Sequence, residues 1–512
     1  MMAEDSGTGF QPVAKHGQDV HDTGGTTGVP PVNGNHEQDA HETSKPRAVI
    51  VARNTVWNLV AKGVDFLGNL IATIMIARVL GVEGFGQFSF VVAFATLFSM
   101  GMDWGLDYIL VREISRRTGD GRVEFAAVLG LKFLFLLALM PVLIVANSTL
   151  SMTKGVRTAI YLAAAGIMMI RVGFTRTAEG IFLVRDAVAQ KALIIILYQV
   201  VRLIGVAYVL WSKGSLIMMF AVMLAADALQ ALVVGFWIHS RHLPISLRLP
   251  KQEISFFFSQ ALPLGITLCC IGIFYQQDTL ILKHFTDDTQ VGLFSSGYRI
   301  IVATVAFITP AFAVLLPELS RKASESLSGV STLSSKVAHY FLAVTIPGVV
   351  VLALVAKTVM VILYGQSFAV AAPVLQFLSV VVFLGSLEFL FAMGLVSLSK
   401  PWWILIATGL GLVINVGLNL LWIPKWAFMG AVYAKLIAEI VTFCAYLMLF
   451  QLAVGGSMFP RWMLRPVAAG VVMVLVVLVS SPLGMIPSIV IGLGVYALSF
   501  FATGLLPVRT DH

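Results

Sequence analysis

Ionisable side chains recur inside stretches of this sequence that are otherwise apolar and long enough to cross a membrane. Six basic residues form one set: Lys62, Arg171, Arg176, Arg202, Arg299 and Lys435. Six acidic residues form a second set: Asp65, Glu179, Asp227, Asp278, Glu388 and Glu439. An ionised group at the bilayer centre costs at least about 2.5–3.5 kcal/mol. We therefore expect both sets to face one another or a shared aqueous cavity rather than lipid.

The basic set is suited to an anionic ligand, because the planar guanidinium of arginine matches the oxygens of a phosphate. The strongest candidates are Lys62, Arg171, Arg202 and Arg299, because helical spacing supplies them no opposite charge except Asp65, three residues after Lys62. The acidic set is predicted to carry a coupling ion, H⁺ or Na⁺, which is the only cofactor expected.

Two pairs within these sets are spaced to meet on one helix face. Lys435 and Glu439 are four residues apart, and Arg176 and Glu179 are three apart. For these residues a structural salt bridge is the alternative to a functional role. Outside the two sets, Lys132 stands near the start of a span, where its amine can reach the interface. Asp103 and Asp107 are expected to pair with Arg112.

Motifs for enzymatic chemistry are missing from the sequence. It has no phosphate-binding Gly-Lys loop, no HExxH motif and no Cys/His cluster with metal-ligand spacing. The three cysteines, Cys269, Cys270 and Cys444, lie in apolar runs, where a thiol behaves as a small buried hydrophobe. We therefore predict a transporter rather than an enzyme, with no metal site and no nucleic-acid partner.

The elements that must position these charges are membrane helices. Of the 512 residues, 58% are hydrophobic and 12% charged, and the mean hydropathy is +0.91. A soluble protein carries about twice this share of charge. With about 20 apolar residues needed per helix, the sequence predicts an all-α polytopic membrane protein with about fourteen spans: 54–77, 87–110, 126–147, 157–181, 188–211, 215–238, 255–282, 291–316, 336–362, 370–398, 402–423, 428–450, 463–481 and 486–506.

Basic residues in the short loops predict the orientation of these spans. With a cytoplasmic N-terminus, the inner segments hold most of the loop lysines and arginines, including Arg112, Arg116 and Arg117. Both termini are then cytoplasmic. Residues 1–47 are rich in Gly, Asp, His and Pro and are predicted to be a disordered cytoplasmic tail rather than a signal peptide. The outer loops are too short for a folded catalytic domain.

An internal repeat divides the spans into two halves. Phe85-Gly86-Gln87-Phe88 aligns with Val291-Gly292-Leu293-Phe294, and at a similar offset Glu179 faces Glu388 and Asp227 faces Glu439. We expect two six-helix lobes around a central cavity, related by an axis along the membrane normal. The predicted parts are an N-terminal lobe at 48–240, a cytoplasmic linker at 241–254, a C-terminal lobe at 255–452 and a helix pair at 453–512.

Several segments resemble the Wzx-type oligosaccharide-lipid flippases, or polysaccharide transporter family, of the multidrug/oligosaccharidyl-lipid/polysaccharide exporter superfamily. They include "IARVLGVEGFGQFSF", "GLDYILVREISRR", "VGLFSSGYRIIVATVAFITPAFAVLLPELSR" and "INVGLNLLWIPKWAFMGAVYAKLIAE", and the likeness extends over roughly 48–506. The resemblance implies a flippase of the bacterial cytoplasmic membrane. It would move an undecaprenyl-diphosphate-linked oligosaccharide outward by alternating access, for surface polysaccharides such as O-antigen or exopolysaccharide, alongside polysaccharide assembly proteins.

Two other functions compete with this interpretation. One is a cation-coupled drug exporter or a lipid II exporter of the same superfamily, against which the several cavity cations indicate an anionic substrate. The other is a membrane glycan polymerase or ligase, which the short outer loops disfavour.

Overall fold

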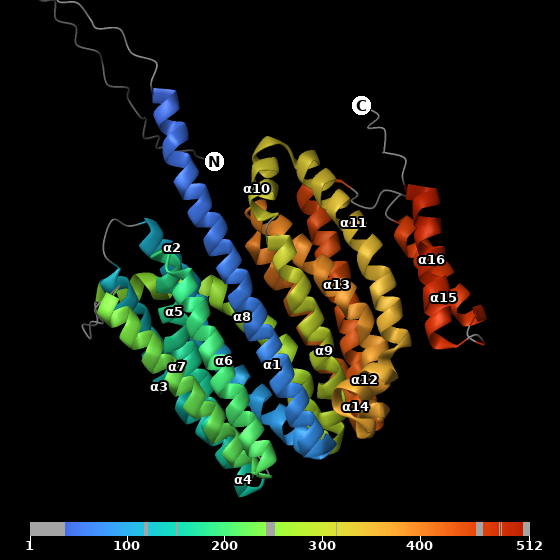
Figure 1. Ribbon diagram of the computed structural model, residues 1–512, viewed down its shortest axis with the longest axis horizontal. Helices are drawn as coiled ribbons and strands as arrows, with labels where there is room; N and C mark the ends of the chain where they lie inside the picture. The colour runs from blue at the N-terminus through green and yellow to red at the C-terminus, as the bar shows by residue number, and fades with distance from the viewer. Residues whose placement is uncertain are drawn as a thin grey trace, which may run out of the picture. The chain divides into compact units, whose positions relative to one another are not determined.

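A computed structural model describes most of the chain, and the described part is helical throughout, without strands (Figure 1). The described residues are 36–116, 121–149, 152–241, 251–313, 315–456, 464–480, 482 and 484–504. The chain divides into two compact units, Met1–Ala52 and Arg53–His512. All contacts considered below lie within the second unit. This architecture confirms the predicted all-α class.

The N-terminal lobe begins with a helix that contains the first predicted span, 54–77, and most of the second, 87–110. Helix α1 (His36–Asp103) is interrupted at Gly81, which has φ 69° and ψ −173°. Glycine adopts this backbone conformation without the steric cost that a Cβ would add. The remaining elements are α2 (Leu106–Arg116), α3 (Arg122–Thr149), α4 (Lys154–Ala164), the π-helix η1 (Ala165–Thr175), α5 (Arg176–Val184), α6 (Val188–Trp211) and α7 (Leu216–Arg241).

The C-terminal lobe repeats this plan. Its elements are α8 (Lys251–Phe285), α9 (Asp288–Ala313), α10 (Leu316–Glu325), α11 (Leu327–Leu354), α12 (Ala356–Tyr364), η2 (Gln366–Ala371), α13 (Ala372–Ser397) and α14 (Pro401–Val454). Helix α14 contains two predicted spans and is interrupted at Ala427. Figure 1 shows α2 to α7 on one side and α9 to α14 on the other, with α1 and α8 between them.

The number of membrane helices agrees with the prediction. Within the described residues, nine helices are long and apolar enough to cross a bilayer, and two of them, from Arg53 and from Pro401, each contain an interruption that makes them helix pairs. Helix α9 and the shorter apolar helices α15 (Leu464–Ser480) and α16 (Met485–Gly504) lie where the remaining three spans are predicted. The last two form the C-terminal pair, which packs on α11 through residues such as Met473 and Tyr496.

The aligned glycines of the two lobes meet face to face. A Cβ on Gly86 would lie 1.8 Å from the carbonyl oxygen of Asp288, and one on Gly292 would lie 2.0 Å from the carbonyl oxygen of Val82. Val82 and Gly86 correspond to Asp288 and Gly292 in the repeat. The two contacts are therefore equivalent and related by a two-fold rotation. The pseudo-two-fold axis therefore passes between Gly86 and Gly292.

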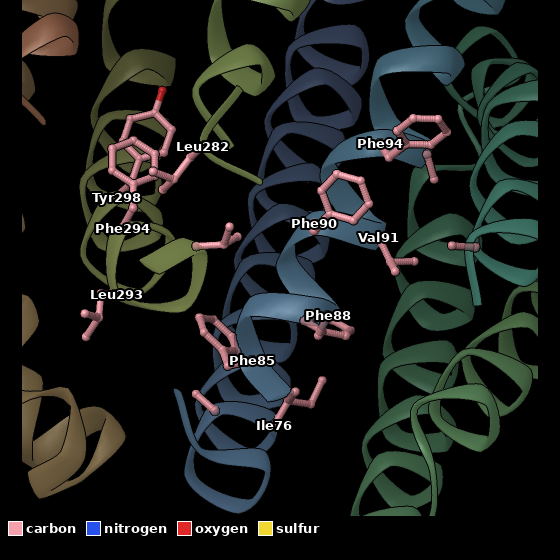
Figure 2. Close-up of a cluster of buried hydrophobic side chains, with 14 of the residues drawn as sticks. Ile76, Phe85, Phe88, Phe90, Val91, Phe94, Leu282, Leu293, Phe294 and Tyr298 are labelled. Atoms are coloured by element: carbon pink, nitrogen blue, oxygen red, sulfur yellow. The ribbon is translucent and has the colours of Figure 1, made fainter. Parts of the chain in front are cut away.

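An apolar core lies beside this contact and contains residues of both lobes. Phe85 and Phe88 of α1 pack with Phe220, Tyr364 and Phe368. Figure 2 shows Phe85 and Phe88 on α1, and the rings of Phe294 and Tyr298 lying against each other on α9. The C-terminal lobe also has a separate core of its own, whereas a further core of the N-terminal lobe includes Phe257 and Ala261 of α8. The lobes are thus joined both near their aligned glycines and along the first part of α8, where Gly265 lies against Trp104.

The predicted part boundaries stay predictions, with two structural details to add. Residues 1–35 of the predicted tail and residues 242–250 of the predicted linker lie outside the described residues. Helix α1 begins at His36, so residues 36–47 are helical rather than disordered.

Candidate functional site

Four cavities with shared walls form a hollow between and within the lobes. The arginine cavity, about 350 Å³, is lined by Arg171, Arg176, Arg202 and Arg299 with Asp227 as its one carboxylate among the described lining residues. The tyrosine cavity, about 320 Å³, lies between α1 and the α8–α9 pair and shares Arg299 with the first. The central cavity predicted from the sequence is present in this form.

The other two cavities adjoin these at either end. The side cavity, about 270 Å³, contains Lys62, Asp65 and Glu179 and shares Arg171 and Arg176 with the arginine cavity. The glutamate cavity, about 560 Å³, lies in the C-terminal lobe, is lined by Glu388 and Glu439, and shares Tyr275 and Tyr298 with the tyrosine cavity. The hollow is thus basic in its N-terminal part and acidic in its C-terminal part.

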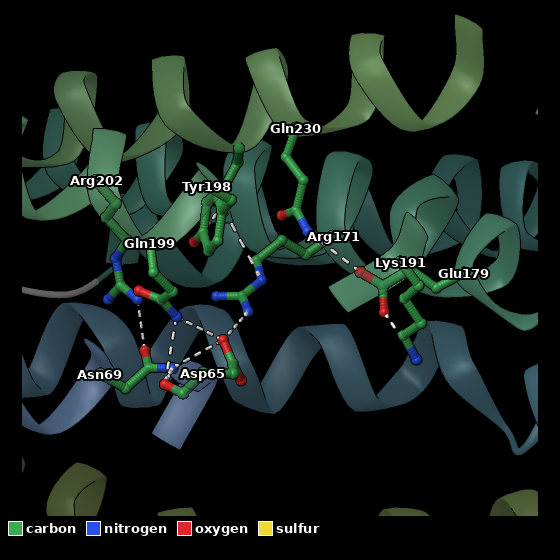
Figure 3. A network of polar contacts seen from close by, with 10 residues as sticks. Asp65, Asn69, Arg171, Glu179, Lys191, Tyr198, Gln199, Arg202 and Gln230 are labelled. Atoms are coloured by element: carbon green, nitrogen blue, oxygen red, sulfur yellow. Dashed lines mark hydrogen bonds and ion pairs between the residues drawn. The ribbon is translucent and has the colours of Figure 1, made fainter. Parts of the chain in front are cut away.

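Arg171 lies at the centre of the polar network in Figure 3. Its guanidinium is 3.9 Å from an oxygen of Asp65 and 4.0 Å from one of Asp227, and it lies over the ring of Tyr198 at 5.5 Å. The Tyr198 hydroxyl donates to Asp227 at 2.8 Å. Helical spacing supplies Arg171 with no acid, but folding brings two carboxylates from α1 and α7 to it. Both lie near the distance limit of an ion pair, so Arg171 retains donors for a ligand.

Arg202 and Arg299 lack a carboxylate partner among the described residues. Arg202 on α6 donates to the side chain of Asn69 at 2.5 Å, and its Nε atom is buried without a hydrogen-bond partner in that part of the chain. Arg299 on α9 lies over the rings of Phe85 and Phe88, both at 5.4 Å. Their predicted role as cations free to bind an anion is compatible with this geometry.

The predicted pair between Arg176 and Glu179 is wrong. Arg176 lies 3.8 Å from Asp103, and Glu179 lies 3.4 Å from Lys191 and accepts from Gln230 at 3.2 Å. The three-residue spacing permits the pair, but a carboxylate on α1 and an amine on α6 lie in better positions. Lys62 is exposed and lines the side cavity beside Asp65.

Lys132 does not reach the interface as the sequence indicated. It is 1% exposed and donates to Asp107 at 2.6 Å and to the carbonyl of Val172 at 2.7 Å, with Asp103 at 3.7 Å. Asp107 therefore pairs with Lys132 rather than Arg112. The Val172 carbonyl belongs to the π-helix η1, and this cluster ties α2 and α3 to the helix that carries Arg171.

The C-terminal lobe contains a second buried lysine. Lys435 lies 3.4 Å from Glu439 and 3.7 Å from Asp278 and donates to the carbonyl of Phe274 at 3.0 Å. The predicted pair of Lys435 with Glu439 is confirmed. Lys435 itself is completely buried and lines none of the four cavities, because two carboxylates hold its amine inside the helix bundle.

The acids of this lobe differ in their partners. Asp278 accepts from Asn419 at 2.6 Å and from Gln277 at 2.8 Å. Glu388 lines the glutamate cavity, and its Oε1 atom is buried without a hydrogen-bond partner among the described residues. The same part of the chain contains no group of three or more His, Cys, Asp or Glu residues arranged to hold a metal ion.

Reasoning from charges alone missed the neutral members of the site. Asn69, Tyr198 and Gln199 orient the charged groups, and Ser89, Ser295, Tyr298 and Tyr364 line the tyrosine cavity. Neutral hydroxyls and amides are common in membrane helices, so their presence alone carries no signal. However, the alignment of the two halves places Ser89 opposite Ser295, and this correspondence could have pointed to these two residues.

This chain is similar to known proteins in both sequence and structure. The family model described as "Polysaccharide biosynthesis protein" matches residues 51–323. A probable low-salt glycan biosynthesis flippase, Agl15 of Haloferax volcanii, is 23% identical over 382 residues, which cover 74% of this chain and 78% of that protein.

Solved structures with the same fold include two kinds of transporter. The lipid II flippase MurJ in an inward closed conformation matches with a TM-score of 0.70 and 14% identity, over 87% of this chain and 98% of that chain. An inward-facing multidrug resistance MATE family transporter matches with a TM-score of 0.62 and 16% identity, over 77% of this chain and 98% of that chain. At these identities the likeness shows the fold alone.

Proposed function

Because the chain belongs to the polysaccharide biosynthesis protein family, we propose that it is a flippase for an undecaprenyl-diphosphate-linked oligosaccharide used in surface polysaccharides such as O-antigen or exopolysaccharide. It moves the headgroup from the inner to the outer leaflet by alternating access of the two lobes. In this proposal the chain is a transporter rather than an enzyme. It resides in the bacterial cytoplasmic membrane with both termini inside and works beside polysaccharide assembly proteins.

The observation that carries this proposal is the charge of the arginine cavity. Four arginines and one carboxylate line it, so the cavity has an excess of positive charge at membrane depth. A diphosphate offers oxygens that several guanidinium groups can bind at once. The lipid tail stays in the bilayer while the polar headgroup occupies the cavity. The similarity to a probable glycan flippase supports this substrate class.

The two alternative functions fit this cavity less well. A cationic drug would meet a surplus of like charge, which disfavours binding. Lipid II is also a polyprenyl diphosphate, so the arginine cavity alone does not exclude it, but the family and the glycan flippase favour an oligosaccharide carrier. A polymerase or ligase would require catalytic groups that the sequence motifs do not supply.

Coupling to an ion is part of the proposal. Asp65 and Asp227 lie beside Arg171. Glu179 lies beside Lys191. Asp278 and Glu439 both lie beside Lys435. Each of these acids therefore has an internal cation nearby. Glu388 has a buried oxygen without a partner among the described residues, and we assign it first among the predicted carriers of H⁺ or Na⁺.

The proposal is tested by flipping of a fluorescent lipid-linked oligosaccharide in proteoliposomes. Arg202→Ala and Arg299→Ala are expected to reduce the initial rate at least tenfold, because each removes a cation of the cavity. Arg241→Ala is the matched control, since Arg241 lies over Trp237 at 4.9 Å and lines none of the four cavities. An imposed proton or sodium gradient in the same assay identifies the coupling ion. Wild-type rates in both cavity variants would overturn the proposal.

A further inference from the structure

The tyrosine cavity differs from the arginine cavity in chemistry. It is walled by α1 on one side, through residues such as Asn69 and Thr73, and on the other by α8, through Gln276, and by α9, through Val302. Arg299 is the one guanidinium or amine among its described lining residues, and no carboxylate lines it. Apart from Arg299, its polar lining side chains are therefore hydroxyls and amides.

Four residues that line this cavity have hydroxyl groups without a hydrogen-bond partner among the described residues. Ser89, Ser295, Tyr298 and Tyr364 are 1%, 3%, 6% and 2% exposed. Each hydroxyl oxygen is buried, and none has a partner within the described part of the chain. A buried polar group left unsatisfied costs about 1–3 kcal/mol. Four such groups on residues that line one cavity are positions at which a ligand can supply hydrogen bonds that the described residues do not.

The surrounding aromatic packing fixes the two tyrosine hydroxyls in place. The ring of Tyr298 is stacked on Phe294 with centroids 5.3 Å apart. The ring of Tyr364 lies 6.0 Å from Phe85 and 5.4 Å from Phe368. Neither ring can turn its hydroxyl elsewhere without disturbing the core between the lobes. The two hydroxyls are preorganised for a ligand.

The two serines approach the cavity from opposite lobes. Ser89 follows Phe88 on α1 and Ser295 follows Phe294 on α9, so they are equivalent positions of the internal repeat. A ligand between them contacts both lobes at once. The cavity volume of about 320 Å³ is in the range of small-molecule sites.

A saccharide matches these features. Its hydroxyls both donate and accept hydrogen bonds, and it carries no charge that would need a counter-ion. An acyl chain would leave all four hydroxyls unsatisfied. Because Arg299 and Asn69 line both cavities, a diphosphate in the arginine cavity places its attached sugar at the entrance to the tyrosine cavity.

We propose that the tyrosine cavity is the saccharide subsite, in which Ser89, Ser295, Tyr298 and Tyr364 bind the hydroxyls of the sugar attached to the diphosphate. This inference rests on the proposed function, because it takes the diphosphate position from the arginine cavity. The subsite recognises the first sugar, and the arginines recognise the carrier.

The test compares two kinds of lipid probe on the full-length protein in nanodiscs. One probe is unsubstituted polyprenyl diphosphate, and the other is the same lipid with one glucose, galactose or N-acetylglucosamine residue. At least one sugar is expected to tighten binding relative to the unsubstituted lipid. Tyr298→Phe and Tyr364→Phe should each weaken binding of the sugar-bearing lipid by about threefold to tenfold. Binding of the unsubstituted lipid should not change.

Thermal unfolding of the ligand-free protein provides a second readout. Tyr298→Phe and Tyr364→Phe should keep or raise Tm, because each removes a buried hydroxyl that has no partner among the described residues. Tyr446→Phe is the matched control: its hydroxyl bonds to Thr408 at 2.8 Å outside the tyrosine cavity. This control should lower Tm, but the sugar should still tighten lipid binding as it does in the wild-type protein.

The two proposals fail in different ways. The saccharide subsite is wrong if no sugar tightens lipid binding, or if the sugar still tightens binding in both tyrosine variants. Neither result contradicts diphosphate binding in the arginine cavity. If unsubstituted polyprenyl diphosphate does not bind the wild-type protein, the proposed carrier site is wrong.

Discussion

Two buried lysines, Lys132 and Lys435, show how the protein accommodates charge at membrane depth. Each contacts two carboxylates and donates to a main-chain carbonyl, of Val172 and Phe274 respectively. A lysine in lipid without partners would be costly. In each lobe the amine is thus an internal cation that joins its own helix to others. Among the cavity cations, Arg202 and Arg299 have no carboxylate partner among the described residues and remain available to a ligand.

Lys132→Met is expected to destabilise the protein by about 3 kcal/mol, because it leaves the carboxylate of Asp107 without its closest cation. Asp107 is 21% exposed, which places the effect at the lower end for a broken buried pair. Chemical or thermal unfolding in detergent measures the change. The double variant Lys132→Met/Asp107→Asn should recover part of the loss, since no unpaired charge remains. An unchanged unfolding midpoint in the single variant would contradict the interpretation.

At the scale of elements, corresponding helices of the two lobes carry the same local features. Glu113-Ile114-Ser115-Arg116 on α2 corresponds to Glu318-Leu319-Ser320-Arg321 on α10. On α10, hydrogen bonds from Arg321 lower the pKa of Glu318 below its usual value. The repeat therefore extends from the paired glycines to the short helices that follow the second span of each lobe.

Gly86→Ala is expected to lower the unfolding temperature and to slow flipping, because its Cβ would lie 1.8 Å from the main-chain oxygen of Asp288. Insertion of a methyl group into such a contact costs about 1–3 kcal/mol. Gly63→Ala is the matched control on the same helix, since no atom lies within 4 Å of its added Cβ. The control should be neutral or stabilising by up to about 1 kcal/mol. Equal behaviour of the two variants would refute a close approach of the lobes here.

At the scale of the whole molecule, the two lobes meet near the aligned glycines, and the basic and tyrosine cavities lie beside that contact. Gln87 of one lobe donates to Asp288 of the other at 3.2 Å. Alternating access requires this contact to open during the cycle.

Cross-linking of Gln87→Cys to Asp288→Cys is therefore expected to stop flipping, with activity restored by reduction of the cross-link. The background replaces Cys269, Cys270 and Cys444 with serine and is first shown to flip substrate. Lys283→Cys with Asp288→Cys is the control within one lobe, where the native side chains are 2.6 Å apart. This control should remain active when cross-linked. Full activity of the inter-lobe cross-link would exclude alternating access through this contact.

The membrane class, the number of spans and the repeat could be predicted from the sequence, because hydropathy and spacing along one chain determine them. The pair between Lys435 and Glu439 was accessible for the same reason, since both residues lie on one helix face. The Arg176–Glu179 prediction used the same rule and was wrong, because nearer partners came from other helices.

Only the tertiary structure decided which charges remain available to a ligand. Asp65 and Asp227 reach Arg171 from distant parts of the chain, whereas Arg202 and Arg299 have no carboxylate beside them among the described residues. The four unpartnered hydroxyls depend even more on packing, because a serine or tyrosine is inconspicuous until its surroundings are known. The sequence by itself determined that buried charges must share a hollow, since hydrocarbon does not solvate them. The folded arrangement determined which walls of that hollow are basic and which carry hydroxyls, because those neighbours are set by contacts between helices.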